Sequence, residues 1–282
     1  MKMFEIASGT MVGRDHRSAG KNNQDAICVL EDLETAIAIV CDGCSSGKYA
    51  EIGSLLGSRF IGVELLKILN ASDCKTEVEA EFILERARQN VLAQLRVLAM
   101  SLGGSFSQTV KDYFLFTVVG AALTQQSTFI FSIGDGFINL NGETLQIGPF
   151  PDNEPPYLGY NLTGSPVTDG RPELLKFTIH KFVPTEEVQF LLIGTDGVKD
   201  LISAEKKKIP GRDEEVGPLS QFWQEDRNFK NPDIVRRRLA IANQEITRLD
   251  QKKSAVEKEL GLLPDDTTLV AIRRKKESKE AG

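Results

Sequence analysis

Six strand-like runs follow one another between residues 113 and 194 with no helical pattern between them, and this block constrains the fold more than any other feature. Short turns such as Asn141-Gly142 join several of the runs, and such turns are typical of β-hairpins. A doubly wound parallel sheet would instead alternate strands with helices. The block therefore predicts mostly antiparallel sheet. The runs are YFLFTVVGAALT (113–124), STFIFSIG (127–134), FINL (137–140), ETLQI (143–147), KFTIH (176–180) and VQFLLIG (188–194).

The rest of the chain supplies a hairpin and helices. AICVL (26–30) and TAIAIV (35–40) are short apolar runs separated by EDLE, which predicts two paired strands. Apolar residues then recur at intervals of three and four over two long stretches, and again in a later one, which predicts helices. We expect an α+β fold, a four-layer α/β/β/α sandwich of two mostly antiparallel sheets flanked by helix pairs. The expected helices are 49–69, 77–100 and 233–251, and a last strand is expected over 265–275.

The length and composition suit one large domain. The chain has 282 residues, of which 41% are hydrophobic, enough to bury a sizeable core. We predict a single domain over residues 1–275. Two stretches rich in Pro, Gly or charge, 148–172 and 206–232, are expected to be surface loops near the site. Residues 276–282 are expected to form a charged tail.

The charge balance bears on possible partners. Lys and Arg number 34 against 40 Asp and Glu, so the net charge is -6 and the pI is near 5.2. Such a chain has no broad positive field for a phosphate backbone, which argues against nucleic acid as a partner. The start lacks a signal-peptide pattern and no stretch is long enough to span a membrane, so we expect a cytoplasmic monomer without membrane contact.

Aspartates stand at the ends of the strand-like runs. An aspartate at a single strand end is ordinarily a turn residue. Three of these, however, are followed by glycine, in CDGC, GDGF and TDGV, and glycine lets the backbone turn sharply and approach a ligand closely. If the strands are neighbours, their carboxylates converge at one place. The strand-end acids are Asp25, Asp42, Asp135, Asp196 and the adjacent pair Asp265 and Asp266.

Converging carboxylates repel one another, so such a cluster is stable when cations neutralise it. Carboxylate and carbonyl oxygens favour Mg²⁺ or Mn²⁺, whereas zinc and copper sites usually recruit His or Cys. The chain has only two histidines, His16 and His180. Two such ions a few ångströms apart can share and activate a water for in-line attack on phosphorus. The pattern therefore predicts a binuclear phosphohydrolase.

Five segments strengthen this interpretation because of their order. They are AGKNNQDAICV, AIAIVCDGCSSGKYAEIG, FSIGDG, FLLIGTDGVKDLI and PDDTTLVAI. The chain resembles, from about residue 9 to 273, the metal-dependent protein serine/threonine phosphatases of the protein phosphatase 2C family, in a form similar to its prokaryotic branch. Each motif alone is short, but together they follow the order of the family.

The resemblance implies a set of metal ligands. Asp42 is similar to the carboxylate that bridges two Mn²⁺ or Mg²⁺ ions, and Gly43 to the residue whose carbonyl holds a metal-bound water. Asp25 resembles the acid that reaches the second ion. Asp196 and Asp265 resemble ligands of the first ion. Asp42 and Asp196 are therefore the expected catalytic residues.

Two further acids have weaker parts in the resemblance. Asp200 matches an acid that helps to hold a third, weaker ion. Asp135 matches a nearby aspartate of the family, to which we give a supporting role.

The sequence departs from the family pattern at two places. Many members have a histidine directly after the Asp-Gly, where it is proposed to protonate the leaving alcohol, and this chain has Cys44 there. Many members also place a phosphate-binding arginine five residues before the first aspartate, where this chain has Gly20. Arg17, Lys21 and His16 are the neighbouring candidates for binding the substrate phosphate.

The CDGC segment allows a competing interpretation as a zinc or dithiol pair. A structural zinc site usually needs a second Cys or His pair at similar spacing, and the chain offers none. A thioredoxin-like dithiol that opens a helix after a strand stays open as an alternative. Otherwise Cys41 and Cys44 are small, partly buried fillers.

Two other phosphate-handling motifs fail. GCSSGK (43–48) has three residues between its glycines where the Walker pattern has four, and Tyr49 follows the lysine in place of Ser or Thr. A cysteine-based phosphatase typically needs Arg six residues after its nucleophile. None of the four cysteines has one at that distance.

The prediction is hydrolysis of phosphoserine or phosphothreonine in proteins by a water that bridges two metal ions, opposing a serine/threonine kinase in signalling. Two alternatives stay open. One is a catalytically weak or inactive relative that acts as a binding module. The other is a phosphatase of small phosphorylated molecules, because both classes of substrate use the same metal centre.

Overall fold

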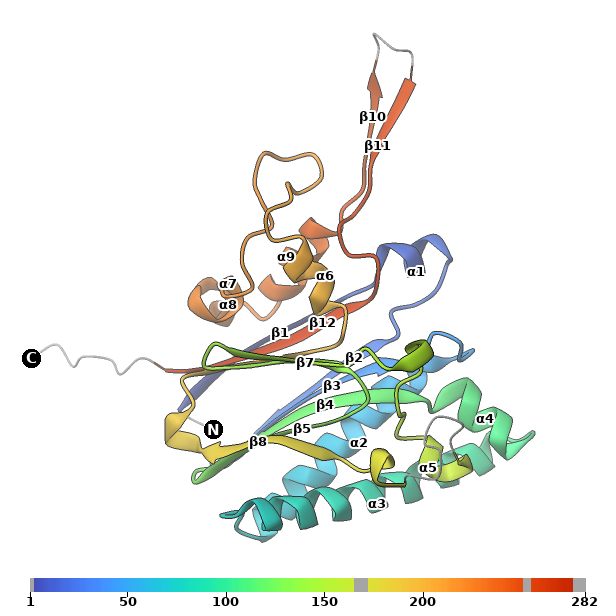
Figure 1. Ribbon diagram of the computed structural model, residues 1–282, viewed down its shortest axis with the longest axis vertical. Helices are drawn as coiled ribbons and strands as arrows, with labels where there is room; N and C mark the ends of the chain where they lie inside the picture. Colours follow the sequence, from blue (N-terminus) through green and yellow to red (C-terminus); the bar gives the residue numbers. More distant parts are fainter. Residues whose placement is uncertain (1–2, 165–171, 251–254, 276–282) are drawn as a thin grey trace, which may run out of the picture.

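The computed structural model describes residues 3–164, 172–250 and 255–275, in which two five-stranded sheets stack face to face (Figure 1). Every strand pair in both sheets is antiparallel. The first sheet has the order β2 (Asp25–Glu31), β3 (Ala36–Gly43), β4 (Phe116–Leu123), β5 (Ser127–Ile133) and β8 (Thr178–Pro184). The second has the order β1 (Phe4–Met11), β12 (Thr267–Arg274), β9 (Phe190–Gly194), β6 (Gly136–Leu140) and β7 (Glu143–Ile147). The predicted antiparallel block and the α+β class are confirmed.

Strand β3 illustrates how the sequence fills the core. Successive side chains of a strand point to opposite faces of its sheet. Ala38 and Val40 therefore pack between the two sheets, whereas Ile39 and Cys41 pack against the helices outside the first sheet. All four are at most 1% exposed. An apolar run without alternation is thus what a strand buried on both faces requires.

Two long antiparallel helices, α2 (Ala50–Ala71) and α3 (Glu77–Ser101), cover the outer face of the first sheet (Figure 1). Thr76 and Glu79 form a capping box that begins α3, because each side chain accepts a hydrogen bond from the backbone of the other. Gly57 lets α2 approach the sheet, since a Cβ there would lie 2.2 Å from the ring of Phe116. The expected helices 49–69 and 77–100 are confirmed to within two residues.

Short helices cover the outer face of the second sheet. Val216 and Phe222, from the stretch 206–232, are buried there, so that this stretch contributes to the core. These helices are α6 (Val198–Ser203), α7 (Gln221–Gln224), α8 (Arg227–Lys230) and α9 (Ile234–Ala242). The remaining short elements are α1 (Arg14–Ser18), α4 (Phe106–Tyr113) and α5 (Tyr160–Thr163), with single 3-10 turns at Pro151–Asn153, Pro172–Leu175 and Thr185–Glu187.

The helix predicted over 233–251 is wrong in its second half. Helix α9 ends at Ala242, and β10 (Ile246–Asp250) pairs with β11 (Ala255–Glu259) in a hairpin that stands away from the body (Figure 1). The physical reason lies at Asn243. Its buried side chain donates to the carbonyl of Val12 and accepts from the amide of Leu263, and these tertiary bonds override the local helical spacing.

The strand predicted over 113–124 begins later than expected. Its first residue, Tyr113, is the last residue of α4, and β4 starts at Phe116. Within the described ranges, no helix is long and apolar enough to cross a membrane. The charged tail expected at 276–282 lies outside the described residues, and the domain boundaries at 1 and 275 stay a prediction.

Candidate active site

The strand-end aspartates meet at one end of the stacked sheets. Asp42, the next-to-last residue of β3, lies directly opposite Asp25, which begins β2, in the register of that strand pair. Asp135 follows β5, Asp196 follows β9, and Asp265 stands just before β12. Asp25 and Asp42 come from the first sheet, Asp196 and Asp265 stand at strand ends of the second, and Asp135 lies in the turn that joins β5 of the first sheet to β6 of the second. A cavity of about 250 Å³ between these ends is lined by all of them except Asp25.

These carboxylates lie close enough to disturb one another. Burial raises the pKa of Asp42 well above its usual value, and the charges of Asp25, Asp196, Asp265 and Asp135 raise it further. Burial likewise raises the pKa of Asp135 to about 6, with Asp196 as the next cause. The pKa of Asp265 is raised by burial and then by Asp196. The site is therefore a partly buried concentration of negative charge.

Asp25 is buried behind the cavity, with 8% of its surface exposed. Burial, and then the charge of Asp266, raise the pKa of its carboxyl group well above the usual value. The hydroxyl of Thr195 donates to Oδ2 at 2.8 Å. Oδ1 is buried and has no hydrogen-bond partner among the described residues. A buried carboxylate oxygen without a partner is costly, so it marks a place for a positively charged ligand.

Gly43 lines the cavity, and its backbone packs closely against the backbone of Gln24 and Ala50. Its amide donates to the carbonyl of Gln24 at 3.1 Å. A Cβ at this position would lie 2.8 Å from the carbonyl oxygen of Ala50, so that only glycine fits without a shift. Cys44 also lines the cavity, and its Sγ lies 3.1 Å from Oγ of Ser46. The four cysteines are free thiols.

Asp196 and Asp200 differ in their relation to the cavity. Asp196 lines it and forms a 2.5 Å ion pair with Lys199, a cation on the first turn of α6. Asp200, on the same helix, does not line the cavity. Burial raises the pKa of Asp200, and Lys199 opposes this shift. Asp200 therefore stands outside the group that faces the cavity.

Asp266, for which the sequence predicted no role, joins three distant segments. Its Oδ1 accepts from the amide of Gly13 and its Oδ2 from the amide of Gln24, both at 2.6 Å. The Nδ1 of His16 lies 3.0 Å from Oδ2. Its side chain is only 1% exposed. In the sequence this residue is only the second acid of PDDTT. Nothing local indicates its hydrogen-bond partners, because they are more than 240 residues away along the chain.

The three phosphate-binding candidates are placed differently. His16 lines the cavity. Lys21 donates from Nζ to the carbonyl of Ser45, a residue that also lines the cavity, at 2.8 Å. Arg17 donates to the carbonyl of Asn243 at 3.1 Å and does not line the cavity. His16 and Lys21 are therefore the two that lie beside it.

Aromatic residues from the stretch 148–172 form the opposite wall. Tyr157 and Tyr160 line the cavity, and their ring centroids lie 5.5 Å apart in an edge-to-face arrangement. Burial raises the pKa of Tyr157, with Cys44 as the next cause. The sequence placed this stretch near the site but did not single out these tyrosines. In the sequence, only the tyrosine of EPPY, Tyr157, could have indicated this wall. A tyrosine in a loop does not by itself indicate a functional site.

Comparison with known proteins gives the family. The family model described as protein phosphatase 2C matches residues 12–244, most of the chain. The chain belongs to the protein phosphatase 2C family. It is thus classed with the protein phosphatases, as the sequence predicted.

Solved structures agree with the fold. A bacterial serine phosphatase has a TM-score of 0.56 and 16% identity, over 98% of this chain and 99% of that chain. Serine/threonine phosphatase Stp1 from Staphylococcus aureus has a TM-score of 0.54 and 15% identity, over 98% and 96%. Serine-threonine phosphatase 2C from Toxoplasma gondii has a TM-score of 0.54 and 15% identity, over 97% and 96%. No curated protein matches the chain in sequence.

Protein phosphatase 2C enzymes are in general dependent on Mn²⁺ or Mg²⁺. In the described part of this chain, no three His, Cys, Asp or Glu side chains already stand in an arrangement that could hold a metal ion. The chemistry of the donors nevertheless suits such an ion. The acids are hard oxygen donors that repel one another, and the buried Oδ1 of Asp25 lacks a partner.

Proposed function

We propose that this chain hydrolyses phosphoserine and phosphothreonine in proteins with the help of two Mn²⁺ or Mg²⁺ ions. The observation that carries the proposal is the convergence of Asp42 with Asp135, Asp196 and Asp265 at one cavity, with Asp25 next to Asp42, in a chain of the protein phosphatase 2C family. A family member that had lost its activity would not need to maintain so many mutually repelling carboxylates.

In this proposal the carboxylates of Asp42, Asp25, Asp196 and Asp265 would hold the two ions, and the carbonyl of Gly43 would help to hold one of them through a water. Asp200 would help with a third, weaker ion and Asp135 would support the cluster. When bound, such ions lower the pKa of water and stabilise the charge that develops on phosphorus during in-line attack. The catalytic aspartates Asp42 and Asp196 supply the negative charge that brings the ions into the cavity.

The substrate phosphate would meet His16 and Lys21 on the side of the cavity formed by the first segment of the chain. The buried carboxylate of Asp266 lies 3.0 Å from Nδ1 of His16 and holds the imidazole ring beside the cavity, where its other nitrogen can meet a phosphoryl oxygen. Arg17 remains a third candidate, although its guanidinium is bound to a backbone carbonyl. Tyr157, whose raised pKa keeps its hydroxyl neutral, can donate a further hydrogen bond.

The biological setting belongs to the same proposal. A phosphatase of this kind would oppose a serine/threonine kinase and act as a cytoplasmic, monomeric signalling enzyme.

The test is an assay of the purified protein on a phosphoserine peptide and on an aryl phosphate, with Mn²⁺ and then with excess chelator. We expect turnover of both substrates that disappears with the chelator and returns with Mn²⁺. Turnover that persists without metal contradicts the proposal. Metal binding without turnover would favour the binding-module alternative, and much faster cleavage of a small phosphorylated metabolite would favour the small-substrate one.

A further inference from the structure

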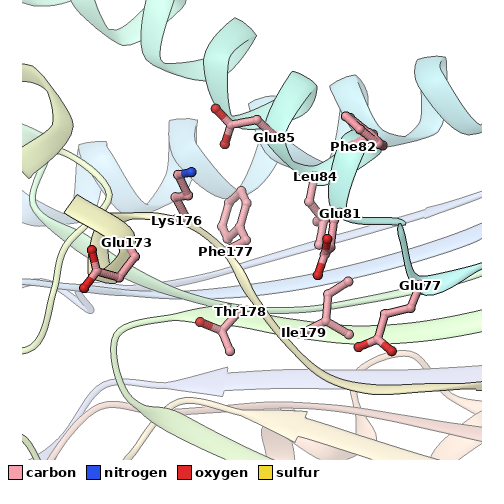
Figure 2. A pocket seen from close by; sticks show the side chains of 10 residues that line it. All are labelled: Glu77, Glu81, Phe82, Leu84, Glu85, Glu173, Lys176, Phe177, Thr178 and Ile179. Atoms are coloured by element: carbon pink, nitrogen blue, oxygen red, sulfur yellow. The ribbon is translucent and has the colours of Figure 1, made fainter. Parts of the chain in front are cut away.

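A second acidic region lies outside the catalytic cavity, between the first half of α3 and the start of β8 (Figure 2). We call it the α3–β8 groove. It encloses about 490 Å³. Leu84, Phe177 and Ile179 form its apolar floor. Its rim carries Phe82 and the four glutamates Glu77, Glu81, Glu85 and Glu173, with Lys176 as the one cation among its lining residues.

The groove offers an apolar anchor point. Phe82 is 72% exposed although it is one of the largest apolar side chains. Phe177 forms part of the floor, where its ring lies edge-on against the buried ring of Phe131 with centroids 5.1 Å apart. An exposed aromatic ring next to a fixed apolar floor, rimmed by polar residues, is the usual form of a surface that binds another molecule.

The charge of the rim indicates the chemistry of that molecule. Four glutamates face one lysine, so the groove carries an excess of negative charge. Glu85 is already engaged by Arg88 through two hydrogen bonds of 2.7 and 2.8 Å. Glu77 and Glu81 are exposed and form no ion pair within the described part of the chain. They are therefore available to a cationic ligand.

The backbone beside the groove favours an extended ligand. Strand β8 is the last strand of its sheet, and among the described residues it pairs only with β5. The side chain of Ile179 points to the helix side of that sheet, where the groove lies. A peptide lying along the open edge would present every second side chain to Phe82 and the glutamates.

The groove is also connected to the catalytic cavity. Arg88 binds Glu85 of the rim and donates from Nη1 to Oδ1 of Asn161 at 2.6 Å. Asn161 lies on α5, next to Tyr160 of the cavity wall. A protein bound in the groove therefore lies on the same side of the molecule as α5 and this wall of the catalytic cavity.

We propose that the α3–β8 groove binds an extended segment of the protein substrate that carries several Lys or Arg residues around one large apolar side chain. The apolar side chain packs on Phe177 beside Phe82, and the cations pair with Glu77, Glu81 and Glu173. That the segment belongs to a substrate rests on the proposed phosphatase function. Its binding to the groove does not, since none of these residues faces the cavity.

Direct binding tests the groove without any catalysis. A fluorescently labelled peptide of alternating lysines around a central phenylalanine is titrated with the protein, and its anisotropy is measured. We expect Glu81→Lys and Phe82→Ala each to weaken binding by about tenfold, and the peptide with glutamates in place of lysines not to bind. Met100→Ala, which removes another exposed apolar side chain of α3 outside the groove, is the matched control and should bind as the wild type does.

Kinetics then test the link to the substrate. A phosphoserine peptide is compared with the same peptide extended by the lysine and phenylalanine segment. We expect the extension to lower KM several-fold in the wild type and in Met100→Ala but not in Glu81→Lys, with kcat unchanged. Equal binding by wild type and Glu81→Lys, or an equal effect of the extension in both, overturns the inference. Absence of turnover on every substrate would instead count against the proposed function, and the anisotropy result would still stand.

Discussion

The catalytic cavity and the α3–β8 groove are both rich in acid, but they hold their acids differently. At the cavity, burial and neighbouring charges raise the pKa of Asp42, Asp135 and Asp265, and of Asp25 behind them. In the groove, Glu77 and Glu81 are exposed around an apolar floor. The extent of burial therefore determines which kind of cation a group of carboxylates can bind. A buried cluster needs a compact, highly charged ion, whereas an exposed ring of acids suits cations on long flexible stems.

The largest expected effect separates the two regions by removing metal. Excess chelator should reduce phosphatase turnover to background and Mn²⁺ should restore it, because the cavity acids depend on divalent ions for catalysis. Binding of the lysine-rich peptide to the groove should stay within twofold, as measured by anisotropy with and without chelator. Loss of peptide binding on chelation would mean that the two regions are not independent.

Asp42→Asn should lower kcat/KM by about a thousandfold or more, since it removes the carboxylate that interacts electrostatically with Asp25, Asp135, Asp196 and Asp265. The free energy of unfolding of the metal-free protein should stay the same or rise, because a repelling buried charge is gone. Urea denaturation measures this. Asp73→Asn, at an acid whose side chain is 70% exposed, is the control and should change neither quantity. A large loss of stability in Asp42→Asn would point to a structural role instead.

Stability of the metal-free protein should depend on pH through Asp135. Its folded pKa of about 6 lies above the usual value of 3.8, so the folded protein holds a proton that the unfolded chain has lost. Stability is therefore lost as pH rises from about 4 to about 6, by up to about 3 kcal/mol. Asp135→Asn should flatten this part of the profile relative to the wild type.

A matched substitution in the groove should leave the dependence of stability on pH unchanged. Glu81→Gln removes an exposed acid, and urea denaturation at several pH values should give the wild-type dependence. A wild-type profile in Asp135→Asn as well would mean that this carboxyl group does not hold its proton in the folded state.

Cys44→Ser should have the smallest effect in the cavity. Its thiol lies beside Ser46 and takes the place where many relatives have a histidine. We expect kcat/KM on an aryl phosphate to change by less than about threefold, because a free thiol contributes little as a proton donor in this position. A loss of a hundredfold would show that the thiol takes part in the reaction. Peptide binding in the groove should not change at all.

The fold was predictable where the pattern in the sequence was long and local. The two long helices and the hairpin of β2 and β3 follow from periodicity, and the antiparallel sheets follow from the short turns between strands. The prediction failed at 233–251, where apolar residues keep helical spacing. There the buried side chain of Asn243 ends the helix through bonds to segments far along the chain. Local pattern contains no information on such bonds.

The candidate site was predictable to the same extent. Aspartates at strand ends, three with a following glycine, identified the acids that line the cavity. The contacts of Asp266 could not be predicted, because they depend on how β12 lies against a segment more than 240 residues away. The groove was equally hidden, since Phe82 looks like a core residue of an amphipathic helix until its exposure is known.

The order of strands has a consequence for when activity can arise during synthesis. Strand β12 is an inner strand of its sheet, between β1 and β9, and it pairs with β1 from the other end of the sequence. Contacts so distant in sequence form late and slowly. The acids of the first sheet can assemble early, but Asp265 joins them only after β12 has inserted. Under the proposed function, we therefore expect no turnover from a chain that lacks β12 (Thr267–Arg274), and the appearance of turnover would report that the second sheet has closed.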